Sequence, residues 1–134
     1  RACAIDLATS LTASSWAVTL GPTRHAFFNA RVADVMLGAN GLQLRDAEGS
    51  TDAETINRGS AEWVSASGPV GGGHEAGLAI WPGEEPRSWF VTDWGVVTVG
   101  SMRTRAVALD AGETLSQTCR VLVHDGPFVG WFDD

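Results

Sequence analysis

Apolar and polar side chains alternate along several stretches of this chain, and a period of two is typical of β-strands with one buried face. The clearest stretches are 3–11 and 115–123, in which most of the apolar residues fall at odd positions, and 16–20, in which they fall at even positions. Shorter apolar stretches extend the prediction. Further strands are predicted over 26–32, 41–45, 62–66, 76–81, 88–92, 96–99 and 106–109.

Turn-forming residues separate these stretches and leave little room for helix. Residues 33–37, which Gly38 follows, fit a single helical turn. Four glycines and a proline in the segment 67–73 predict a loop, because such a run cannot continue a hydrogen-bonded ladder. We therefore expect an all-β fold, an antiparallel β-sandwich, in which residues 1–134 form a single domain or a half-domain.

Composition narrows the functional classes. The chain has 134 residues, of which 44% are hydrophobic and 19% charged, as in globular domains. The net charge is −7, which argues against a nucleic-acid partner because phosphate binding needs a basic surface. No apolar run reaches the roughly 18–20 residues of a membrane helix, so we expect a soluble protein with no membrane contact.

The termini and the cysteines leave two questions open. The chain starts at Arg1 without a signal-peptide pattern, which suggests a processed product or a piece of a longer chain, and its compartment stays open. Cys3 and Cys119 either form a disulfide that closes most of the chain or are two buried free thiols.

Familiar catalytic and cofactor motifs are missing from the sequence. It contains neither Gly-x-Ser-x-Gly nor His-Glu-x-x-His, and no lysine follows the glycines at 71–73. The three histidines and two cysteines show no metal-ligand spacing. We therefore predict no cofactor and no bound metal.

The aromatic residues favour a sugar ligand. Six tryptophans and no tyrosine form a skewed set, and indole rings stack on the C–H faces of sugars. Trp89 and Trp94, with Arg87 and Asp93 beside them in the sequence, are candidates for the lining of a carbohydrate cleft. The alternative for each tryptophan is packing in the core.

Two titratable residues are candidates for acid–base chemistry. His124 ends the longest predicted strand, and Asp93 stands in a turn. The alternative is that His124 is a hydrogen-bonded turn histidine and that Asp93 only closes its turn. Together with Arg31 and Trp89, these residues are predicted to lie near one concave surface, because each is polar or amphipathic and stands beside an apolar run.

A series of short motifs resembles a known family. The motifs are Phe28-Asn29-Ala30-Arg31-Val32-Ala33-Asp34, Ala61-Glu62-Trp63-Val64 with Ser67-Gly68-Pro69, Gly77-Leu78-Ala79-Ile80 with Pro82, Trp89-Phe90-Val91 with Asp93-Trp94-Gly95, Ala111-Gly112-Glu113-Thr114-Leu115, and Arg120-Val121-Leu122-Val123-His124-Asp125-Gly126. Their order and rough spacing, over most of the chain, are similar to the C-terminal half of the bacterial PmoA-like family.

That resemblance implies a galactose-mutarotase-like sandwich and a role in bacterial sugar catabolism. It does not imply methane oxidation, because the chain has neither membrane spans nor a copper-ligand cluster. The His-rich motif in the N-terminal half of the family has no counterpart here. The family has a characteristic loop after the strand that corresponds to residues 76–81. Of the residues typical of that loop, this chain keeps only Pro82 and Arg87.

Three hypotheses of function follow. The chain is part of a carbohydrate-active enzyme, a sugar-binding module without catalysis, or a structural subunit that completes a partner's core. We predict that the chain does not act alone and that its partner is a second protein chain, either a missing N-terminal half or another copy of this chain. The alternative is that its strands close their own sandwich and that the chain is a monomer. A half-sandwich leaves an uncovered sheet face or edge, and such an edge recruits other strands.

Overall fold

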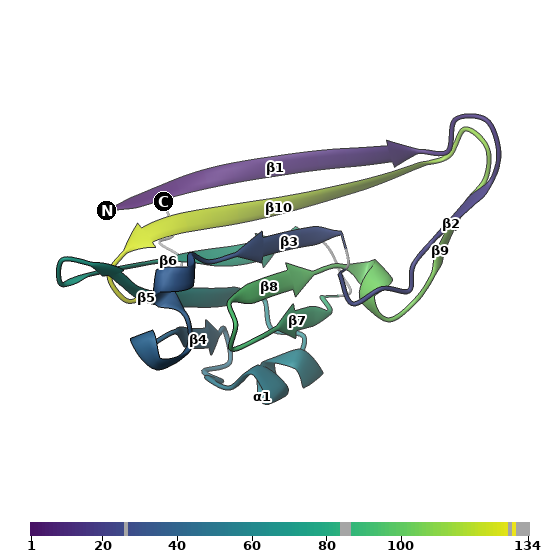
Figure 1. Ribbon diagram of the computed structural model, residues 1–134. Helices are drawn as coiled ribbons and strands as arrows, with labels where there is room; N and C mark the ends of the chain where they lie inside the picture. The colour runs from purple at the N-terminus through teal and green to yellow at the C-terminus, as the bar shows by residue number, and fades with distance from the viewer. Residues whose placement is uncertain (26, 84–86, 129, 131–134) are drawn as a thin grey trace.

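The computed structural model describes residues 1–25, 27–83, 87–128 and 130, and all of its described strand pairs are antiparallel (Figure 1). Its described strands form a large sheet of five strands, a small sheet of three strands and a two-stranded ribbon. The order in the large sheet is β1 (Ala2–Thr12), β10 (Thr114–Asp125), β6 (His74–Pro82), β5 (Val64–Gly71) and β4 (Gln43–Asp46). The order in the small sheet is β3 (Phe28–Arg31), β8 (Val96–Val99) and β7 (Trp89–Val91). The all-β prediction is confirmed.

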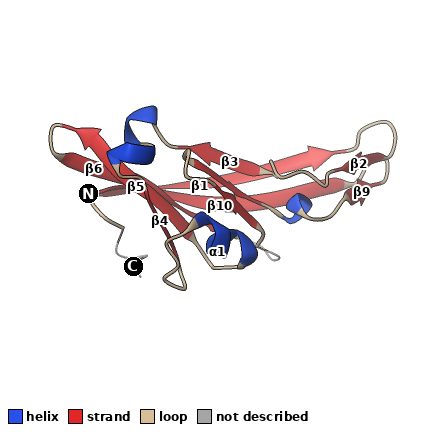
Figure 2. Ribbon diagram, turned by 60° about the horizontal axis from the view of Figure 1, so that its bottom comes forward, coloured by secondary structure: helices blue, strands red, loops and turns tan. Residues whose placement is uncertain are grey.

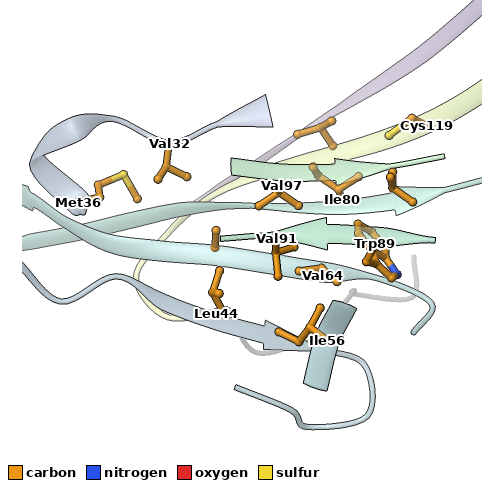
Figure 3. Packing of buried hydrophobic residues seen from close by; sticks show 13 residues of the cluster. Val32, Met36, Leu44, Ile56, Val64, Ile80, Trp89, Val91, Val97 and Cys119 are labelled. Carbon is orange, nitrogen blue, oxygen red and sulfur yellow. The ribbon is translucent and has the colours of Figure 1, made fainter. Parts of the chain in front are cut away.

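The core lies between the two sheets (Figure 3). Alternation places one row of each strand in it: Val64, Ile80 and Val121 from the large sheet face Val91 and Val97 from the small sheet. We call this side of the large sheet its inner face and the opposite side its outer face. Because side chains alternate along a strand, neighbouring residues such as Leu122 point to the outer face.

One short helix closes the lower end of the core. Helix α1 (Ala53–Arg58) begins at Asp52, whose carboxylate accepts a hydrogen bond from the Thr55 backbone N–H at 2.8 Å. Its Ile56 is fully buried in the core cluster. This helix was not predicted from the sequence, because six residues are too few to show a helical period.

The predicted loop over 67–73 was wrong. Strand β5 continues to Gly71 and forms a hairpin with β6, whose two-residue turn is Gly72-Gly73. Both turn glycines have positive φ angles, 61° and 78°, and a two-residue hairpin turn of this kind favours glycine at both positions. The ladder tolerates Pro69 because its register shifts between Pro69 and Gly71.

Three 3₁₀ turns complete the described elements. They are η1 (Asp34–Met36), η2 (Gly38–Asn40) and η3 (Ser101–Arg103). The first confirms the helical turn predicted at 33–37. No helix within the described ranges is long and apolar enough to cross a membrane.

A long two-stranded arm joins the two sheets. Strands β1 and β10 pair along their whole lengths, and the chain then bends into the short ribbon of β2 (Val18–Leu20) and β9 (Val107–Leu109), which leads to the small sheet (Figures 1 and 2). Every residue of β1 is exposed, including Ile5, Leu7 and Leu11, which belong to its inner-face row. The small sheet does not extend far enough to cover β1.

The register of the arm decides the state of the cysteines. Cys3 lies opposite Val123, and Cys119 lies opposite Leu7, so the two residues are separated along the ribbon. Both are free thiols, which excludes the disulfide. The expectation of two buried thiols holds only for Cys119, because Cys3 is exposed. Burial raises the pKa of the Cys119 thiol to about 12.

Candidate functional site

The two predicted acid–base residues lie on opposite sides of the large sheet. His124 is on the outer face, where its ring packs against Phe128 with the ring centres 5.1 Å apart. Asp93 is exposed in the turn between β7 and β8, strands of the small sheet that covers the inner face. The predicted single surface is therefore wrong, because both residues end strands but the strands belong to different layers.

Trp89 lies in the core and lines no cleft. It is fully buried, and its indole N–H donates a hydrogen bond to the Ala61 carbonyl at 2.8 Å (Figure 3). A ring closed off in this way cannot stack on a sugar, so the core alternative holds for Trp89. Arg87 is half-buried in the segment that leads into β7.

Arg31, Asp93 and Trp94 gather at one end of the small sheet. Arg31 lies opposite Val96 in the register, and Val96 directly follows the turn that holds Asp93 and Trp94. Its guanidinium forms an exposed ion pair with Asp34 at 3.0 Å, and Trp94 is also exposed, at 47%. The structure therefore brings three of the six predicted site residues to one end of the molecule, on exposed turn and strand-end positions.

A hollow that contains none of the six predicted site residues opens on the outer face of the large sheet. It measures about 310 Å³ and lies where β1, β10 and β6 run side by side. Asp6, Arg120 and Trp81 form one cross-strand row of its lining, because Arg120 is the register partner of both others. Thr118 and Gly83 lie one row further along. An indole face, a charged pair and a hydroxyl thus border one concave surface.

Hydrogen bonds fix the polar groups of this hollow. The Arg120 guanidinium donates two hydrogen bonds to the Asp6 carboxylate, at 2.6 and 2.9 Å, in the fork geometry that arginine forms with carboxylates. This hydrogen bonding lowers the pKa of Asp6, so the carboxylate stays ionised at neutral pH. The Trp81 indole N–H donates to Glu62 at 3.1 Å, which orients the ring.

The outer face continues from the hollow toward His124. Arg120, Leu122 and His124 are successive outward residues of β10, so the distance from the first to the last is about 13 Å at the usual strand rise. Trp63 and Phe128 cover the middle of this path, with their ring centres 4.7 Å apart. The hollow and the His124 region therefore belong to one continuous surface.

A smaller apolar cavity lies on the inner face beneath the arm. It measures about 120 Å³, and Leu7, Phe28, Val99 and Cys119 are among its lining residues. It marks the place where β1 extends beyond the small sheet and the two layers no longer fill the space between them.

Sequence reasoning missed the hollow because its residues are far apart in the chain. Asp6 and Arg120 become neighbours only through the pairing of the first and last strands. Trp81 ends the strand predicted over 76–81, and for this ring, as for the other tryptophans, the sequence left core packing open as an alternative. In the described part of the chain, no three His, Cys, Asp or Glu side chains form a group that could hold a metal ion.

Comparison with known proteins identifies the family. A family model described as "Family of unknown function (DUF6807)" matches residues 1–129. The chain belongs to the DUF6807 family. The match covers every described strand of this DUF6807 protein, and hence the hollow and the His124 region. No curated protein and no solved structure matches it.

Proposed function

We propose that this DUF6807 chain is a carbohydrate-binding β-sandwich module whose ligand lies in the hollow beside Trp81. The observation that supports it best is the row of Asp6, Arg120 and Trp81 along one concave surface. An indole face stacks on the C–H face of a sugar ring, and a carboxylate and a guanidinium hydrogen-bond its hydroxyls. The resemblance to the PmoA-like family, with its galactose-mutarotase-like fold and sugar catabolism, agrees with this proposal.

Binding is favoured over catalysis in this proposal. Acid–base work on a glycosidic bond needs two groups of separated pKa that face one pocket. Asp6 is held ionised by Arg120 on the outer face, while His124 lies about 13 Å along the same strand. A carbohydrate-active enzyme stays the alternative if another chain supplies the missing acid.

The test of the proposal is a substitution of the indole. We expect Trp81→Ala to weaken binding about tenfold, the loss that corresponds to one aromatic stacking contact. The measurement is isothermal titration calorimetry with a panel of methyl glycosides and the matching disaccharides.

The matched control is Trp16→Ala. Trp16 is 73% exposed in the bend that follows β1, outside the hollow, and its loss should leave the affinity unchanged. If no glycoside in the panel binds, or if both substitutions weaken binding equally, the proposed function is wrong.

A second candidate function is protein interaction, and the exposed arm favours it. We propose that a second copy of this chain covers β1. Strand β1 lies at the end of the large sheet, and no described strand pairs with its free edge. The inner-face row of Ile5, Leu7 and Leu11 is exposed. Long, flat edge strands without lysine, proline or bulges are prone to pair with another strand.

Strand β1 is self-complementary in an antiparallel pairing centred on Leu7. In that register Leu7 of one copy lies opposite Leu7 of the other, and Cys3 lies opposite Leu11, so the apolar row stays on one face. Asp6, the only charged residue of β1, lies opposite Ala8 and meets no like charge directly. This pairing would join the two large sheets into one.

A further inference from the structure

We propose that His124 marks a second subsite for the carbohydrate and that Phe128 occupies this subsite in the unbound protein. The inference rests on the proposed function, and it extends the ligand from a single sugar ring to an oligosaccharide along β10. It gives His124 a binding role, whereas the sequence suggested an acid–base role.

The first observation is an unsatisfied nitrogen. The side chain of His124 is 6% exposed, and its Nδ1 lies 2.9 Å from the Gly126 carbonyl oxygen. A carbonyl oxygen only accepts, so Nδ1 carries a proton, and Nε2 of the neutral ring presents a lone pair. Nε2 is buried and has no hydrogen-bond partner among the residues that the structure describes. A buried acceptor without a donor is costly, and a ligand hydroxyl would satisfy it.

The second observation is the shape of the sheet beside His124. Gly77 is its register partner, and Ser67 is the next residue in the same cross-strand row. A side chain at position 77 would not fit, because its Cβ would lie 2.6 Å from both the Ala66 carbonyl oxygen and the Ser67 Cβ. Position 77 therefore places no side chain of its own between His124 and Ser67, and the Ser67 hydroxyl donates a hydrogen bond to the Glu75 carboxylate at 3.3 Å.

The third observation is the position of Phe128. Its ring packs on His124 and on Trp63, and its other side borders a cavity of about 380 Å³ that Ser65 and Ser67 also line. Both serines are buried. The aromatic ring thus covers Ala79 and Leu122, and the two buried serines lie at its side.

These observations point to one arrangement. Phe128 lies where a second sugar ring would stack on Trp63, and a hydroxyl of that ring would donate to Nε2 of His124. Phe128 belongs to the short segment after β10, so it can leave the surface without breaking any strand pairing. Ligand binding and the docking of Phe128 then exclude each other, and the docked ring weakens the affinity for longer ligands.

The test is Phe128→Ala, assayed by calorimetry with methyl glycosides and the matching disaccharides. We expect the affinity for the disaccharide to rise about tenfold, the gain for a site that is open in about one molecule in ten. The affinity for the methyl glycoside should stay unchanged, because that ring binds beside Trp81. Adding His124→Ala should abolish the gain, and long-range ¹H–¹⁵N spectra of Phe128→Ala should show the His124 Nε2 signal shifting as the disaccharide is added.

The controls separate this inference from the proposed function. Phe90→Ala removes a half-buried ring from the small sheet and should not change affinity. If Phe128→Ala folds poorly, Phe128→Leu replaces it in the test, because leucine keeps an apolar cover over Leu122. This variant should give an intermediate gain in affinity for the disaccharide. If binding depends on Trp81 but neither Phe128 variant strengthens disaccharide binding, only the inference fails. If no glycoside binds to any variant, both fail.

Discussion

Trp81 and Trp89 show how the environment of a side chain, not its type, decides its role. Both belong to strands, and both indole N–H groups donate a hydrogen bond. Trp89 points between the sheets and is fully buried, whereas Trp81 points to the outer face and borders the hollow. Only the second ring has a face available to a ligand.

The burial of Trp89 leads to a prediction about stability. Trp89→Phe removes the donor for the buried Ala61 carbonyl and leaves a smaller ring. The free energy of unfolding should therefore fall by about 2–4 kcal/mol. Urea denaturation followed by circular dichroism measures this. Trp94→Phe, at an exposed turn position, should change the free energy of unfolding by less than about 0.5 kcal/mol. Similar values for the two variants would contradict the core position of Trp89.

At the scale of elements, a single carboxylate determines where α1 begins. Asp52 accepts the Thr55 backbone N–H, which satisfies one of the free donors of the first turn. This hydrogen bond lowers the pKa of Asp52 below its ordinary value of 3.8. The helix in turn delivers Ile56 to the core, so a local polar contact supports the packing of both sheets.

The cap predicts a measurable acid dependence. A carboxyl whose pKa is lowered by folding stabilises the folded state above its unfolded pKa, and this contribution is lost as the pH falls through the folded pKa. Between pH 7 and pH 3 the wild type should therefore lose more thermal stability than Asp52→Asn, which keeps a capping acceptor but does not titrate. Asp52→Ala should be less stable at pH 7 and should show the same weakened acid dependence as Asp52→Asn. Identical pH profiles for wild type and Asp52→Asn would count against the cap.

At the scale of the whole molecule, the arm leaves the sandwich asymmetric. Five strands face three, and the strand without a covering layer is β1. The apolar cavity of about 120 Å³ beneath β1 has the same cause, because the small sheet does not fill the space under this strand. A second copy that pairs with β1 would satisfy the free backbone groups of its edge and would place the two exposed apolar rows side by side.

The pairing of β1 predicts the mass in solution. Light scattering on the purified chain should give twice 14.1 kDa. Added salt should strengthen the dimer, because each copy carries a net charge of −7 and salt screens their repulsion. Ile5→Lys should produce monomers, since it places a charge in the apolar row.

The matched control for the dimer is Val70→Lys. Val70 and Ile5 are both 44% exposed, but Val70 lies near the β5–β6 hairpin and not on the arm. This control should stay dimeric. A stable wild-type monomer that binds no hydrophobic dye would show that β1 needs no partner, and a larger complex with another protein would show that a different chain covers it.

The sequence by itself determined the strands, because the alternation of apolar and polar residues depends only on the two faces of each strand. It predicted β1, β6 and β10 near their observed bounds and the helical turn at η1. It could not predict α1, because a helix of six residues is too short to show a helical period. It also could not predict the path of β5 through Gly68 and Pro69, because the hairpin with β6 stabilises that path.

Only the tertiary structure decided which face each residue shares with which others. Alternation separates inward from outward side chains but gives no information on which strands are neighbours, and that is why His124 and Asp93 were predicted on one surface. The pairing of β1 with β10, at opposite ends of the chain, brought Asp6 to Arg120 and Trp81. The candidate site therefore depends on long-range strand order, which the free energy of the whole fold determines and no local pattern contains.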